Sequence, residues 1–342
     1  MLSTGDIVSL QALARYKIPA HVPTDGIKLN ELASKVDLDE VILTRLIRNG
    51  IVEGIFEEQR PGLIQHTPIS RLLQDPDFTA LVSFYIEENG AAASKTLDAL
   101  EKWHGSREPA HTGFALVNGT AEPFFKELSK TPERVKRAAG AFNALPQMLV
   151  QGNDGLSRSP LWKEIDRMGA TVVDVGGNRG HASMQLARTT EHVQFIVQDL
   201  PRPVKLGEET LPIEYQGRIR FMVQDFFTEQ MEKGADVYFL RKVMHDFPDH
   251  YCIRILRNLV PAMRSGTRIV VCDRMMPETS KAGYEQREAR FSDLAMLQLL
   301  NGCERSKSDW RRLFKEADSR FDVDFERWEG NIHGLIKATW YA

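Results

Sequence analysis

The sequence of 342 residues predicts an α/β protein in which a mostly helical domain precedes a Rossmann-like parallel sheet that ends in a β-hairpin. Apolar, β-branched runs alternate with segments of helical composition from residue 170 onward, and the runs lie at 170–175, 194–198, 219–223, 236–240 and 268–272. Strands that alternate with helices indicate a parallel sheet covered on both faces. Two last strand-like runs, 321–325 and 335–340, flank a Gly330-Asn331 turn.

The composition excludes several classes of partner. The 44 Lys and Arg residues stand against 47 Asp and Glu, a formal net charge of −3. Without a basic excess we expect neither nucleic acid nor an anionic membrane as a partner. No apolar stretch approaches the roughly 20 residues that span a bilayer, and the N-terminus lacks a signal-peptide pattern, so we expect a cytoplasmic protein. The three cysteines are too few and too widely spaced for a disulfide framework or a zinc cluster.

The N-terminal region has the pattern of a winged helix. Apolar residues recur at helical spacing over 29–36 and 42–47, with Asp39 as the expected N-cap of the second helix. Two strand-like runs follow, at 51–56 and 63–66, and predict a two-strand wing.

A winged helix raises the question of DNA binding. The second helix offers Arg45, Arg48 and Asn49, but acidic residues flank it and its charge is nearly balanced. Phosphate binding needs several basic residues on one face, so we expect a packing or dimerisation module instead. The polar stretch 103–109 marks the expected boundary, which gives domains over 1–105 and 106–342.

A glycine-rich turn follows the first strand of the predicted sheet. The run Val172 to Val175 ends in Gly176-Gly177, so the backbone at the carboxyl end of the strand can approach a ligand closely. Asn178 stands where a dinucleotide fingerprint requires its second glycine, so the turn does not match that motif.

Acidic residues follow the next two strands. Asp199 ends the second strand, where a carboxylate can accept both hydroxyls of a ribose. Asp225 follows the third strand, where it is suited to bind an adenine amino group while Phe226 packs on the ring. Each acid could equally cap a helix. Three successive strand ends that carry glycine or acid together predict a nucleoside-containing ligand.

These segments resemble the plant caffeate-type and fungal secondary-metabolite O-methyltransferases over essentially the whole chain. The matching segments are Asp174–Gly177, Gln198–Pro201, Gln224–Phe227, Leu240–Phe247, Val271–Pro277, Asp293–Met296 and Gly302–Ser306. The resemblance implies a class I methyltransferase fold, a dimerisation role for the winged helix and a homodimer. It also implies S-adenosylmethionine as cofactor, contacted by Gly176, Asp199, Asp225, Phe226 and Arg241. Arg241 stands where plant members usually have lysine.

His245 is the expected catalytic base. It follows the fourth strand and begins a helix, with Asp246 and Pro248 suited to a helix start. A histidine with a pKa near 6.5 can take the proton of a phenol during attack. The resemblance assigns two acids, Asp273 and Glu304, one of which would accept the other ring N–H and orient the imidazole.

The structural alternative for Glu304 is a surface salt bridge with Arg305. Asp273 is the shorter acid where plant relatives carry glutamate. No acidic cluster indicates a catalytic magnesium ion, so no metal is expected.

The sequence therefore predicts methylation of a phenolic or enolic hydroxyl on a small secondary metabolite. A second hypothesis keeps the fold and cofactor but assigns a dehydration or pericyclic reaction, with the sulfonium as a fixed charge. Lys242, at a position that is usually apolar or aromatic, and Asp273 favour that second reading. A third, a catalytically inactive regulator, is opposed by the retained His245 and its acids.

Overall fold

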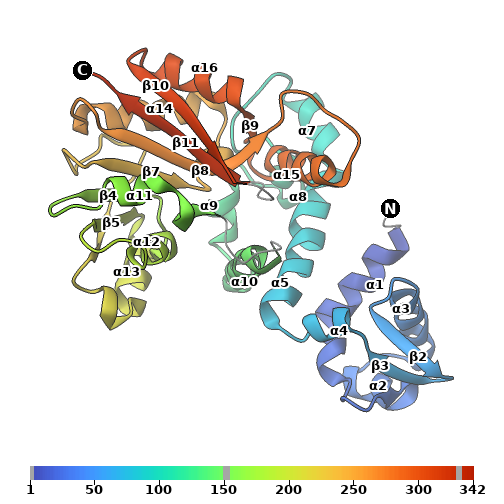
Figure 1. Ribbon diagram of the computed structural model, residues 1–342. Helices are drawn as coiled ribbons and strands as arrows, with labels where there is room; N and C mark the ends of the chain where they lie inside the picture. The colour runs from blue at the N-terminus through green and yellow to red at the C-terminus, as the bar shows by residue number, and fades with distance from the viewer. Residues whose placement is uncertain (1–3, 149–154, 329–332) are drawn as a thin grey trace. The chain divides into compact units, whose positions relative to one another are not determined.

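The computed structural model describes residues 4–148, 155–328 and 333–342, and the chain divides into two compact units (Figure 1). The first unit comprises residues 1–104 and 112–152, and the second comprises 105–111 and 153–342. This division differs from the expected single boundary at 105/106. The reason is that α10 (Pro132–Met148) packs along α5 (Pro76–Phe84), which places it with the N-terminal helices.

The first unit begins with the predicted winged helix. It contains α1 (Thr4–Arg15), α2 (Leu29–Val36) and α3 (Glu40–Val52), and a sheet of strand order β1-β3-β2 (Ile27–Lys28, Leu63–His66, Phe56–Arg60). The carboxylate of Asp39 caps α3 by accepting the backbone N–H groups of Val41 and Ile42 at 3.0 and 3.1 Å, which confirms the predicted cap.

One wing strand was predicted in the wrong place. Residues 51 and 52 continue α3, and the strand β2 starts only at Phe56. Gly54 reverses the chain between them with a φ of +73°, a conformation that favours glycine.

Short helices complete the first unit. They are α4 (Pro68–Leu72), a π-helical turn (Tyr85–Gly90), α6 (Ala91–Ser94), α7 (Thr96–Lys102), α8 (Gly113–Asn118) and α9 (Phe124–Leu128). Glu88, buried in the π-helical turn, forms ion pairs with both Arg134 and Arg137 of α10. These pairs compensate a buried carboxylate and join α10 to the first unit.

The second unit is built on one twisted sheet. Its strand order is β10-β11-β8-β7-β4-β5-β6, and β4 to β8 run parallel to one another. The bounds are β4 (Thr171–Val175), β5 (Gln194–Asp199), β6 (Ile219–Val223), β7 (Val237–Arg241) and β8 (Arg268–Met276). The runs read from the sequence therefore match all five parallel strands.

The chain ends in the predicted hairpin. β10 (Phe321–Arg327) pairs antiparallel with β11 (His333–Trp340), which in turn pairs antiparallel with β8. The expected Gly330-Asn331 turn lies outside the described residues.

Helices cover both faces of the sheet, as predicted. One face packs against α14 (Asp249–Leu259) and α16 (Lys307–Ala317), and the other against α11 (Pro160–Glu164) and α12 (His181–Ala187). The remaining elements are α13 (Pro201–Thr210), α15 (Tyr284–Leu300) and the short strand β9 (Arg305–Ser306), which pairs with β8. In the described ranges, no helix has the length and apolar character needed to cross a membrane.

Candidate functional site

The predicted cofactor residues meet at one edge of the sheet. Because β4, β5, β6 and β7 are parallel neighbours, their carboxyl ends lie side by side. Gly176 follows β4, Asp199 ends β5, Asp225 follows β6 and Arg241 ends β7. The topology therefore gathers the residues that the sequence had placed on separate strands.

The glycine turn leaves no room for a side chain. Gly176 has a φ of +72°, and a Cβ atom added to it would lie 2.9 Å from Val243 and 3.5 Å from the ring of Phe226. The N–H groups of Gly176 and Gly177 both donate to the carbonyl oxygen of Gln198, at 2.8 and 3.0 Å. The turn thus exposes bare backbone next to an aromatic wall, which suits close approach by a ligand.

Asn178 fits this turn although a dinucleotide fingerprint would have glycine at its position. It has a φ of +52°, which asparagine tolerates better than most residues. Its N–H donates to the Asp199 carboxylate at 2.8 Å, and the N–H of Leu200 donates to the other oxygen at 2.7 Å. Asp199 is therefore held rigidly, and burial raises its pKa.

Asp225 and Phe226 occupy the neighbouring loop. The exposed Asp225 accepts the N–H of Phe227 at 2.8 Å, so it has a local turn role in addition to any ligand role. Phe226 makes edge contacts with Phe227 and Phe247, with ring centroids 4.9 and 5.8 Å apart. These contacts fix the plane of the ring that faces Gly176.

Asp174 was not predicted as a site residue, although it belongs to this cluster. It is 1% exposed and accepts the hydroxyl of Ser183 at 2.6 Å. Burial raises its pKa to about 6, against the lowering effects of the Ser183 bond and the positive charge of Arg241. A charged residue inside the otherwise apolar run of residues 172–175 is the signal that could have identified it.

The residues at this edge fit a nucleoside-bearing cofactor. Gly176 provides the close backbone approach, Phe226 an aromatic wall and Asp199 a carboxylate acceptor for hydroxyl groups.

His245 lies in a short 3-10 turn, Met244–Asp246, directly after β7. The expectation that it begins a helix was wrong, because α14 starts only at Asp249, after Pro248. Proline at this N-terminal position lacks the N–H that a helix would leave unpaired. The turn places His245 two residues beyond Val243, the residue closest to a side chain built on Gly176.

Glu304 holds the His245 ring. Nδ1 lies 3.1 Å from Glu304 Oε1 and Nε2 lies 3.5 Å from Asp246 Oδ1. Since a carboxylate only accepts, Nδ1 carries the proton and donates it to Glu304. Glu304 Oε1 also accepts the Ser292 hydroxyl at 2.8 Å. The His245 side chain keeps 19% of its surface exposed, against 2% for Glu304, so the ring can be reached and its acid cannot.

The alternative pairing of Glu304 with Arg305 was wrong. Arg305 pairs instead with Asp249, at 2.8 Å.

The two carboxylates change the proton affinity of His245. Burial lowers the pKa of the imidazole, but the charges of Glu304 and Asp246 and the Glu304 hydrogen bond outweigh it and raise the pKa to about 10. Burial raises the pKa of Asp246 to about 6, while His245 lowers it. The two carboxylates therefore favour the protonated form of the ring.

Asp273 lies beside this pair without a hydrogen bond to it. It is 1% exposed, and neither carboxylate oxygen has a hydrogen-bond partner. Burial raises its pKa to about 7 against the lowering effect of His245. Of the two acids assigned by resemblance, Glu304 contacts the ring, whereas Asp246, which immediately follows His245 and was not assigned, takes the second nitrogen.

Lys242 adopts a left-handed backbone conformation, with a φ of +54°. Its charge helps to lower the pKa of the buried His333 on β11. Lys242 is therefore electrostatically coupled to the β8–β11 side of the site.

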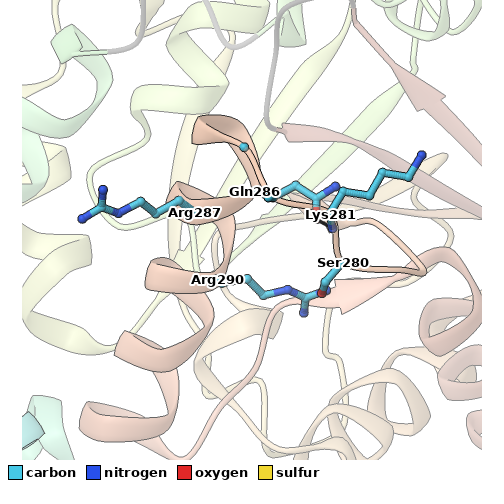
Figure 2. Close-up of a pocket in the computed structure, with 7 residues that line it drawn as sticks. Ser280, Lys281, Gln286, Arg287 and Arg290 are labelled. Carbon is cyan, nitrogen blue, oxygen red and sulfur yellow. Dashed lines mark hydrogen bonds between the residues drawn. The ribbon is translucent and has the colours of Figure 1, made fainter.

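An open pocket at the start of α15 lies apart from these residues. It is lined by Ser280, Lys281, Gln286, Arg287 and Arg290, with Ala282 and Gly283. Figure 2 shows that Arg287 extends away from Lys281, so the basic side chains do not converge on one point. The pocket contains none of the predicted site residues. Within the described part of the chain, no group of three or more His, Cys, Asp or Glu residues is arranged to hold a metal ion.

Comparisons with known proteins show the family of the chain. The family model of the O-methyltransferase domain matches residues 134–320. A grayanic acid biosynthesis cluster O-methyltransferase of Cladonia grayi is 36% identical over 344 residues, which cover 98% of this chain and 72% of that protein. A chlorophenol O-methyltransferase of Trichoderma longibrachiatum is 37% identical over 349 residues, which cover 98% and 73%.

Solved structures have the same fold. OxaC in complex with sinefungin and meleagrin has a TM-score of 0.85 at 26% identity, over 98% of this chain and 85% of that chain. LepI in complex with S-adenosylmethionine has a TM-score of 0.84 at 23% identity, over 98% and 86%. The likeness to LepI shows the fold alone.

Proposed function

The chain belongs to the O-methyltransferase domain family, and we propose that it methylates a phenolic or enolic hydroxyl of a small secondary metabolite with His245 as general base. The named relatives support this substrate class, since one acts in a grayanic acid cluster and another on chlorophenol. The observation that carries the proposal is the His245–Glu304 hydrogen bond of 3.1 Å beside the glycine turn.

S-adenosylmethionine is the cofactor. When bound, it supplies an electrophilic methyl group on a positively charged sulfur. We assign its binding to Gly176, Asp199, Asp225, Phe226 and Arg241. Gly176 would admit the cofactor against bare backbone, Asp199 would accept ribose hydroxyls, and Phe226 would cover the adenine.

His245 would take the proton of the acceptor hydroxyl. A phenol has a pKa of about 10, close to the pKa of about 10 that Glu304 and Asp246 give His245, so proton transfer between them is nearly balanced. Glu304 stabilises the protonated ring and holds it through Nδ1, which leaves Nε2, 3.5 Å from Asp246 Oδ1, as the nitrogen that would take the proton. The free enzyme must first lose the His245 proton, so activity rises with pH through the neutral range.

Methyl transfer is tested with labelled S-adenosylmethionine and a panel of phenols and polyketides. The expected result is one methyl group transferred per cofactor consumed. His245→Ala is expected to lose transfer while it retains cofactor affinity by calorimetry. Full transfer by folded His245→Ala would remove His245 from the role of base.

A second candidate function keeps the cofactor without methyl transfer, as a pericyclase or dehydratase. The observation that favours it is the pair of carboxylates at the ring nitrogens of His245, Glu304 at 3.1 Å and Asp246 at 3.5 Å, because a ring that stays protonated donates hydrogen bonds and charge rather than accepting a proton. Product formed from a polyketide-type substrate without cofactor consumption would select this function over the first.

We also propose that the protein is cytoplasmic and that it forms a homodimer, the assembly that its resemblance to the O-methyltransferases implies. Light scattering tests the assembly, and a monomer at micromolar concentration would contradict it.

A further inference from the structure

We propose that Arg305 is a positioning residue that holds the backbone of the His245 turn in register with Glu304 and so fixes the orientation of the catalytic ring. The activity part of this inference rests on the proposed function, but the orientation of His245 can be measured without any turnover.

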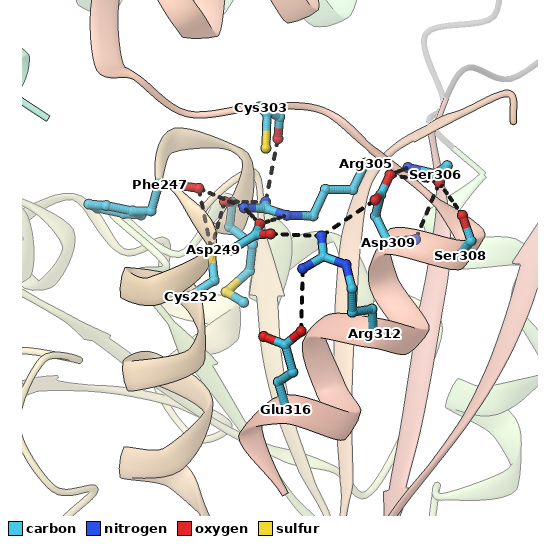
Figure 3. Close-up of polar contacts among 11 residues, drawn as sticks. Phe247, Asp249, Cys252, Cys303, Arg305, Ser306, Ser308, Asp309, Arg312 and Glu316 are labelled. Carbon is cyan, nitrogen blue, oxygen red and sulfur yellow. Dashed lines mark hydrogen bonds and ion pairs between the residues drawn. The ribbon is translucent and has the colours of Figure 1, made fainter. Parts of the chain in front are cut away.

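Arg305 binds the His245 turn on both sides of the histidine, and Figure 3 shows its contact with Phe247. Its Nη1 donates to the carbonyl oxygen of Met244 at 2.9 Å, and its Nη2 donates to that of Phe247 at 2.8 Å. Met244 immediately precedes His245 and Phe247 lies two residues after it. The guanidinium therefore spans the turn and fixes both of its ends.

The charge of Arg305 is compensated where it lies. The side chain is 2% exposed, and Nε and Nη2 donate to Asp249 Oδ1 at 2.9 and 2.8 Å. Asp249 is the first residue of α14, so Arg305 joins the turn to the helix that follows it. Such a charge-assisted, multiply bonded guanidinium has one stable position.

Consecutive residues hold the turn at three different points. The N–H of Cys303 donates to the carbonyl oxygen of His245 at 3.1 Å, Glu304 binds its ring, and Arg305 binds the flanking carbonyls. Arg305 also pairs with Met275 in the β9–β8 bridge. Movement of the turn relative to this segment would change the His245–Glu304 distance directly.

Arg312 provides a matched control. It donates to Asp249 Oδ2 at 2.8 Å, from a side chain that is 49% exposed. In Figure 3 its guanidinium lies on the side of Asp249 that faces Glu316. Arg312→Gln therefore removes one cation from Asp249 and leaves the carbonyl contacts of Arg305 in place.

The test follows the His245 ring by NMR titration in Arg305→Met, Arg305→Lys and Arg312→Gln. In Arg305→Met the pKa of His245 should fall by at least about one unit, because the ring is no longer held at Glu304. Loss of the Arg305 charge alone would raise that pKa, so the sign separates positioning from electrostatics. The other ionisable groups that face His245, which are Glu304, Asp246, Asp273 and His333, are unchanged in all three variants.

Activity gives the second measurement. We expect kcat to fall at least roughly tenfold in Arg305→Met, with cofactor affinity retained. Arg305→Lys should recover part of both losses, since one ammonium replaces the three donating nitrogens of the guanidinium. Arg312→Gln should match the wild type. An unchanged His245 titration in folded Arg305→Met would overturn the inference. If Arg305→Met does not fold, the inference would be overturned by an Arg305→Lys variant whose His245 titration and kcat both equal those of the wild type. The His245 titration can be measured even if the protein transfers no methyl group. Failure of the proposed function can therefore be distinguished from failure of this inference.

Discussion

Glu304→Gln tests whether the buried acid sets the basicity of His245. Glutamine keeps the size of the side chain and a carbonyl acceptor for Nδ1 and Ser292, but it removes the negative charge 3.1 Å from the ring. The rise of the His245 pKa from 6.5 to about 10 corresponds to about 5 kcal/mol of preference for the protonated ring, at about 1.36 kcal/mol per unit. Glu304 is the largest contributor that raises it, ahead of Asp246.

In the wild type, we expect kcat/KM to rise with pH up to about 10, as His245 loses its proton. In Glu304→Gln the rising part of this pH profile, called its limb below, should move to lower pH by at least about one unit. The plateau value of kcat/KM should also fall by roughly 10- to 1000-fold, because the protonated His245 ring that forms during attack is no longer stabilised by a carboxylate.

The assay is initial methyl transfer between pH 5.5 and about 10.5, with cofactor binding measured across the same range. Ser292→Ala serves as the control, since it removes the other bond to Glu304 and leaves the charge in place. A limb at the same pH in Glu304→Gln and in the wild type would refute the assignment of Glu304 as the source of the raised pKa. A limb that moves upward would refute the sign of the electrostatic argument.

Three further outcomes are expected. Gly176→Ala should weaken cofactor binding at least roughly tenfold by calorimetry, because a Cβ would meet Val243 at 2.9 Å; unchanged affinity would contradict the glycine turn as the cofactor site. Asp273→Asn should be more stable than the wild type by an amount that grows between pH 3.8 and about 7, up to about 4 kcal/mol. The wild type loses stability over this range because the unfolded chain releases the Asp273 proton above pH 3.8, whereas the folded protein keeps it up to about pH 7. A gap in melting temperature that shrinks over this range would oppose this. Asp199→Asn should reduce cofactor affinity without shifting the His245 titration, and a shift in that titration would show that the two sites are coupled.

The parallel sheet was predictable because burial on both faces produces continuous apolar runs. The five parallel strands accordingly lie within a residue or two of their predicted positions at the start of each strand, whereas β8 extends to Met276. The wing strand β2 was misplaced because Ile51 and Val52 have strand-like composition but continue α3 in the structure. Local composition cannot separate these two cases.

The site was predictable only in part. Strand ends could be aligned from the sequence, because parallel topology brings them to one edge. The sequence could not show whether Asp273 or Asp246 lies next to the second ring nitrogen of His245, since this depends on side-chain direction. Consecutive strand residues face opposite ways, and the 3-10 turn that brings Asp246 to Nε2 has no clear signature in composition. A surface pair between Arg305 and Glu304 was the alternative interpretation, because adjacent opposite charges suggest a pair, whereas burial directs them to different partners.

The attachment of the His245 turn to residues 303–305 has a consequence for how acceptor preference diversifies within such a scaffold. The apparatus that orients His245 is a compact module, supplied by one stretch of chain and anchored to β8 and Asp249. Substitutions elsewhere in the protein can reshape what is methylated without disturbing that module. Conversely, an insertion or deletion within this short stretch would shift all three attachments at once. Enzyme engineering for new acceptors should therefore randomise other surfaces of the site and leave this segment intact.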